Sequence, residues 1–85
     1  MNLEERRQFA CEIGFRFELA ISDLVCNHTE RLYYPTAAAA RAEVAACMQR
    51  AGLVPNRTFG HSESWVMACN SEGEATALYV INDLG

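Results

Sequence analysis

The sequence predicts an α+β fold: a four-stranded, mainly antiparallel sheet packed by one long helix over residues 36–51 and a short N-terminal helix. Three observations predict it. An alanine-rich segment in the middle of the chain carries apolar residues at helical spacing. Residues 11–21 alternate between apolar and polar or small side chains, which is typical of a half-buried strand. Two short apolar runs near the C-terminus flank a turn that contains Gly73, the pattern of a β-hairpin.

The short N-terminal helix is predicted over residues 3–10. Asn2 is a suitable N-cap, and Glu5 follows it at the spacing of a capping box. Glu4 and Glu5 place two negative charges in the first turn, where they interact favourably with the helix dipole.

Residues 11–24 admit two interpretations. The odd positions from Cys11 to Ile21 are all apolar, which favours a strand. A helix would also gather apolar residues on one side, but it would leave Phe15 and Leu19 among charged residues. It would also carry Gly14 in its interior at a cost of about 1 kcal/mol. We expect the strand, and one long helix over residues 3–26 is the alternative.

A loop from Asp23 to Glu30 and a short strand from Arg31 to Tyr34 are expected next, with the strand paired to the first one as a hairpin. Successive side chains of a strand point to opposite faces. Tyr33 and Tyr34 therefore cannot both face the core, and one of them is expected at an edge, at the surface or in an interface.

The long helix is the clearest element. Thr36 is a good N-cap, and Gly52 is placed to end the helix in the left-handed conformation, with an apolar contact between Met48 and Leu53. Pro55 prevents the helix from continuing. The expected buried stripe consists of Ala37, Ala40, Val44, Cys47, Met48 and Ala51.

The C-terminal third is expected to form a loop over residues 56–62, a strand from Trp65 to Cys69, a turn and a last strand from Ala75 to Ile81. This last strand is apolar on both faces, which is typical of a central strand. The sheet face that the long helix leaves free should carry either Leu78 or Tyr79, and such a surface invites a partner or self-association.

The bulk properties exclude several classes of protein. With 85 residues, the chain has room for a single domain, 1–85, and little for an elaborate active site. A net charge of -4, with no lysine, argues against nucleic-acid binding. No segment approaches the roughly 20 apolar residues of a membrane span, and the N-terminus lacks the pattern of a secretory signal. We expect a cytoplasmic protein whose four cysteines are free thiols.

The residues that could form a metal or catalytic site match the known spacing patterns poorly. Cys26, His28, His61 and Cys69 are the residue types of a zinc site, but only one end of the set has the close spacing that zinc ligands show. Neither Cys26 beside His28 nor Ser62 and Ser64 beside His61 comes with an evident third residue to orient a catalytic base. The sequence has no glycine-rich phosphate loop. We therefore expect no enzyme activity, no metal and no cofactor.

The function favoured by these observations is that of a small, non-enzymatic protein-binding module. Our specific expectation is an inhibitor or decoy of a host protein that occludes a basic surface. In size, acidity and lack of motifs the chain is similar to phage counter-defence proteins such as anti-CRISPRs, although no residue motif identifies a family. The alternatives are a homodimeric structural or regulatory protein and, less favoured, a small zinc- or DNA-binding protein. The interface candidates are Tyr33, Tyr34, Trp65, Glu63, Glu72, Glu74 and Asp83.

Overall fold

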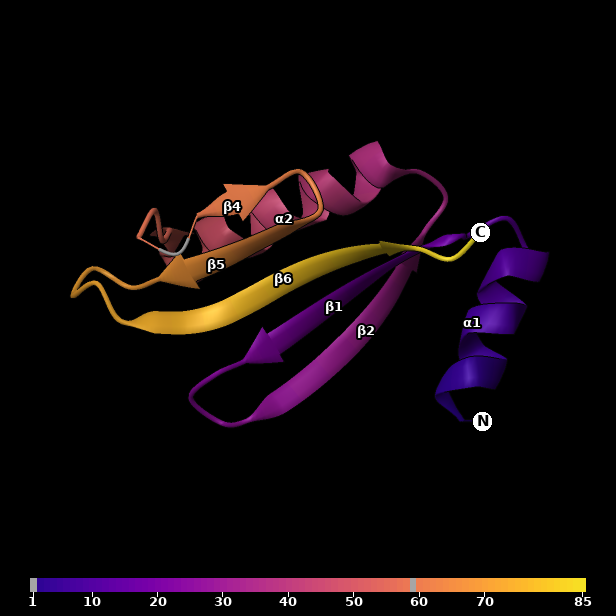
Figure 1. Ribbon diagram of the computed structural model, residues 1–85, viewed down its shortest axis with the longest axis horizontal. Coiled ribbons are helices and arrows are strands. Elements are labelled where there is room, and N and C mark those ends of the chain that lie inside the picture. Colours follow the sequence, from indigo (N-terminus) through magenta and orange to yellow (C-terminus); the bar gives the residue numbers. More distant parts are fainter. Residues whose placement is uncertain (1, 59) are drawn as a thin grey trace.

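The computed structural model describes residues 2–58 and 60–85, and of His61 only the main chain. The fold is α+β, with two helices and an open antiparallel sheet (Figure 1). The elements in chain order are α1 (Leu3–Glu12), β1 (Phe17–Asp23), β2 (His28–Tyr34), α2 (Ala37–Ala51), β3 (Val54–Pro55), β4 (His61–Ser62), β5 (Trp65–Cys69) and β6 (Ala75–Asp83).

The strands lie in the order β2-β1-β6-β5-β3, and the short strand β4 also pairs with β5. All of these pairings are antiparallel. β6 occupies the centre of the sheet, which confirms the prediction drawn from its two apolar faces. The sheet has more than the four strands expected, because two-residue segments at Val54–Pro55 and His61–Ser62 also pair with β5. Pro55 is tolerated there because β3 is an edge strand.

The predicted strand over residues 11–21 is wrong in its first half. α1 continues to Glu12, and Gly14, with a φ of 87°, ends the helix. The amide of Gly14 bonds to the carbonyl of Cys11 and that of Phe15 to the carbonyl of Ala10, which is the Schellman pattern. Residues 11–24 therefore form neither one strand nor one helix throughout. The glycine cap ends the helix and allows an extended strand to begin at Phe17.

The predicted hairpin of β1 and β2 is confirmed, but the loop between them is shorter than expected. β2 begins at His28 instead of Arg31, and its seven residues pair with all seven of β1. The turn is closed by Asp23, whose Oδ1 accepts hydrogen bonds from the amides of Val25 and Cys26. Asn27 supplies the left-handed residue, with a φ of 55°.

Both caps of the long helix α2 are confirmed. Thr36 Oγ1 accepts a hydrogen bond from the amide of Ala39, and Gly52 adopts the left-handed conformation with a φ of 67°. The amide of Leu53 then bonds to the carbonyl of Met48. The core under α2 consists of Leu19, Val44, Met48, Ala68, Ala77 and Tyr79.

The pairing register decides which side chains face α2. Leu19 lies opposite Ile81, and Ile21 lies opposite Tyr79. Since directly opposed residues of antiparallel strands point to the same face, these side chains all lie on the α2 side. Leu78 therefore points to the other face of the sheet, which decides between the two alternatives that the sequence left.

Candidate interaction surface

The sheet face opposite α2 is the candidate site, and we call it the open face. β1 contributes Glu18, Ala20 and Ser22 to it, and the register extends this set across the sheet. From β2 come Thr29, Arg31 and Tyr33, from β6 Leu78, Val80 and Asn82, and from β5 Trp65 and Met67.

The open face is divided into an apolar and a polar half. Trp65 lies directly opposite Val80, and Met67 lies opposite Leu78. These four side chains are each partly exposed, and the small Ala20 adjoins them. They form the apolar half over β5 and β6.

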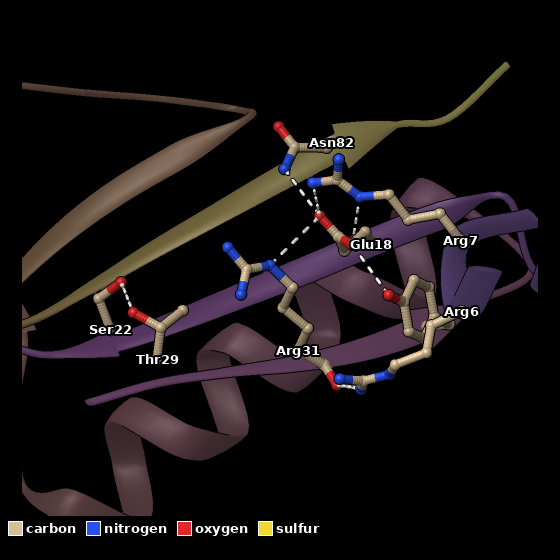
Figure 2. Close-up of polar contacts among 8 residues, drawn as sticks. Arg6, Arg7, Glu18, Ser22, Thr29, Arg31 and Asn82 are labelled. Carbon is tan, nitrogen blue, oxygen red and sulfur yellow. Dashed lines mark hydrogen bonds and ion pairs between the residues drawn. The ribbon is translucent and has the colours of Figure 1, made fainter. Parts of the chain in front are cut away.

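The polar half lies over β1 and β2. The hydroxyls of Ser22 and Thr29 are 3.1 Å apart (Figure 2). Arg31 stands beside them, and its Nε is buried without a hydrogen-bond partner among the described residues. The two hydroxyls, which can each make further hydrogen bonds, thus border the apolar half.

Glu18 organises the end of the open face next to α1 (Figure 2). Its side chain is 0% exposed. Arg7 donates to both carboxylate oxygens, from Nε to Oε2 at 2.8 Å and from Nη2 to Oε1 at 2.7 Å. Tyr33 Oη donates to Oε2 at 3.0 Å and Asn82 Nδ2 to Oε1 at 3.2 Å. Arg31 Nε approaches Oε1 at 3.9 Å. These contacts are what a buried carboxylate requires to remain ionised.

The contacts around Glu18 shift the pKa values of Glu18 and of Tyr33. The hydrogen bond from Arg7 lowers the pKa of Glu18 to about 2, against the opposing effect of burial. Burial, followed by the contact with Glu18, raises the pKa of Tyr33. Tyr33 therefore acts as a neutral hydrogen-bond donor to an ionised carboxylate, and this end of the face is rigidly specified.

α1 lies beside this end of the sheet (Figure 1). Besides Arg7, its contacts include Arg6, which donates to the carbonyl of Arg31 at 3.1 Å and lies over the ring of Tyr33. Phe9 of α1 and Ile13, its C-cap residue, remain 52% and 53% exposed. The helix is attached through these polar and cation–π contacts and through Ala10, which is buried, and it leaves the apolar half of the face uncovered.

The aromatic interface candidates lie in three different settings. Tyr34 packs against the core on the α2 side. Tyr33 lies on the open face, but its hydroxyl donates a hydrogen bond to Glu18 and its ring contacts the Arg6 guanidinium. Trp65 lies at the end of the apolar half. Of the three, Trp65 is the one available for a contact from this face.

The acidic candidates do not form one group. Glu63 lies in the turn before β5, whereas Glu72 and Glu74 lie in or beside the turn after it. These three residues lie at the two ends of β5. Asp83 lies at the end of β6 and pairs with Arg16 at 3.4 Å. The acidic candidates are thus divided between the two ends of β5 and the end of β6, with Asp83 already bound to an arginine.

The cysteines and histidines are dispersed. Cys26 and His28 lie at the exposed tip of the β1–β2 hairpin, whereas Cys69 is buried in β5. The side chain of His61 lies outside the described residues. Within the described part of the chain, no three His, Cys, Asp or Glu residues are grouped so that they could hold a metal ion. Cys47 bonds to Glu43 on α2, and burial raises the pKa of its thiol.

Sequence reasoning missed the role of Glu18. Its even-numbered position in an alternating segment indicates a solvent-facing residue, whereas the structure buries it. The only local signal is the position of this acid between Phe17 and Leu19 in an apolar strand. The basic partners of Glu18 are Arg7 of α1 and Arg31 of β2. Because both are distant from Glu18 in the sequence, no local pattern indicates the ion pairs.

Neither helix in the described part of the chain is long and apolar enough to cross a membrane. Comparisons of the chain with protein-family models, with curated proteins and with solved structures found no match.

Proposed function

We propose that the protein is a non-enzymatic binding module that attaches to another protein through the apolar half of its open face. The observation that carries this proposal is that α1 lies at one end of the sheet and leaves the apolar half of that face uncovered. Trp65, Met67, Leu78 and Val80 stay partly exposed side by side on β5 and β6. Adjacent apolar side chains with a polar border are typical of protein interfaces.

The borders of the apolar half support a basic partner. Glu63 lies before β5, and Glu72 and Glu74 lie after it, with no ion pair to any of them among the described residues. Carboxylates at the rim of an interface guide the approach of a positively charged surface and select against acidic ones. An inhibitor or decoy that occludes such a surface fits this arrangement best.

Affinity capture from an extract of the native cell tests the proposal. We expect a protein partner that is retained through the apolar contact and released in part at higher salt, because rim charges are screened. Light scattering on the purified protein is the companion measurement. A stable dimer that captures no second protein would support the homodimer instead, and a monomer that captures none at low or moderate salt would refute the proposal.

A further inference from the structure

A pocket of about 200 Å³ lies between α2 and strands β5 and β6. Its apolar lining comes from α2 and from strands β5 and β6, through Val44, Ala45, Met48, Val66, Tyr79 and Ile81. An aliphatic cavity of about 150 Å³ takes up benzene. The space and lining therefore suit a branched aliphatic group or one aromatic ring.

The mouth of this pocket is polar. Arg41, Ser62 and Glu63 line it, and the same three residues also line an adjoining hollow that contains Ser64 and Asp83. A molecule whose apolar part enters the pocket would consequently place its polar part between these side chains. The arrangement selects an amphipathic ligand with a short polar head.

The mouth also offers both signs of charge. Neither Arg41 nor Glu63 forms an ion pair with any described residue. By contrast, the other acid in the hollow, Asp83, is already paired with Arg16. Arginine binds carboxylates through paired hydrogen bonds, and a glutamate carboxylate accepts hydrogen bonds from an ammonium group. The free charges thus match a ligand that carries both of these groups.

We propose that this pocket binds a free amino acid with a large apolar side chain. The side chain would occupy the apolar lining, the carboxylate would bind Arg41, and the ammonium group would bind Glu63. Most of the lining lies between α2 and the sheet, and only Trp65 and Glu63 are shared with the borders of the open face, so ligand binding here is a function additional to protein binding.

L-Phenylalanine is the probe, titrated into the full chain. Trp65 is the only tryptophan and lines the pocket as well as ending the apolar half of the open face, so its fluorescence reports binding at either site and the NMR signals distinguish the two. Side-chain NMR signals of Val44, Met48 and Ile81 give a second readout. 3-Phenylpropionate lacks the ammonium group and 2-phenylethylamine lacks the carboxylate, and we expect each to bind about tenfold more weakly than phenylalanine.

Two charge variants assign the head group. Arg41→Gln should weaken phenylalanine binding by about tenfold and leave 2-phenylethylamine unchanged. Glu63→Gln should weaken phenylalanine binding similarly and leave 3-phenylpropionate unchanged. Arg57→Gln and Glu72→Gln are the matched controls, since each removes an exposed charge outside the pocket lining.

A third variant tests the apolar part. Ala45 is an exposed residue of the lining, so Ala45→Phe should fill the pocket and abolish binding while the circular dichroism spectrum stays unchanged. Ala42→Phe places the same ring on the same helix outside the lining. Absence of phenylalanine binding at millimolar concentration, equal affinity for all three compounds, or NMR changes confined to the open face would overturn the proposal.

Discussion

Arg7 on α1 holds both carboxylate oxygens of the buried Glu18 on β1, at 2.8 and 2.7 Å. This relationship joins the N-terminal helix to the sheet. It also defines where the open face ends, because Tyr33 and Asn82 bond to the same carboxylate. The uncovered apolar half begins beyond this cluster.

Replacing Arg7 by methionine should lower the free energy of unfolding by about 2 kcal/mol, measured by urea denaturation. Loss of one partner leaves the buried Glu18 charge uncompensated, but Arg7 is 38% exposed, so the loss stays below that of a fully buried pair. Arg50→Met is the control, because the pair of Arg50 with Glu43 is exposed and should matter little. Equal losses in the two variants would contradict the role assigned to Glu18.

The pH dependence of stability should also depend on Glu18. Its pKa falls from an ordinary value of 4.5 to about 2 in the folded protein. A lowered folded pKa means that the unfolded chain binds protons first, so the stabilisation is complete above pH 4.5 and is lost as the pH falls toward 2. Urea denaturation across this range should show a shallower acid loss for Glu18→Gln than for the wild type. Parallel profiles would exclude Glu18 as the responsible group.

Gly14 should be sensitive to substitution even though a Cβ there would meet no atom within 4 Å. Its φ of 87° is unfavourable for residues with a side chain. Thermal unfolding of Gly14→Ala should show a loss of about 1 kcal/mol, and Gly14→Asn should lose less, since asparagine tolerates the left-handed region better. A neutral Gly14→Ala variant would show that the cap does not fix the start of β1.

The same glycine explains where prediction from sequence succeeded and where it failed. The caps of α2 depend only on residues that are close in the sequence, so the roles of Thr36 and Gly52 could be predicted from the sequence. The alternation of apolar residues from Cys11 to Ile21 is also a pattern of neighbouring residues. Its first half does not correspond to a buried strand face, because Ile13 and Phe15 remain exposed. Periodicity alone does not reveal whether a core lies beneath a segment.

The candidate surface was predictable only in part. That one face of the sheet would lack a covering helix followed from the small number of elements. Which side chains it carries followed only from the register, which placed Leu78 outward and Tyr79 inward. The Glu18 cluster was hidden because its partners are separated from it by 11 to 64 positions in the sequence.

The cysteines should react at different rates with iodoacetamide in the native protein. Cys11 and Cys26 are exposed, whereas Cys69 is buried. Burial and the contact with Glu43 raise the pKa of Cys47, which lowers its reactive thiolate fraction. Mass spectrometry should detect Cys11 and Cys26 labelled before the other two. Prior labelling of Cys47 would contradict its environment on α2.

The affinity of the captured partner for Met67→Lys measures the central claim most directly. Met67 lies opposite Leu78 within the apolar half, so a lysine there should weaken binding by at least about tenfold, as loss of a central interface contact does. Val25→Lys is the matched control, because Val25 is 74% exposed at the hairpin tip, and it should bind as the wild type does. Unchanged affinity for a folded Met67→Lys variant would contradict binding through the open face.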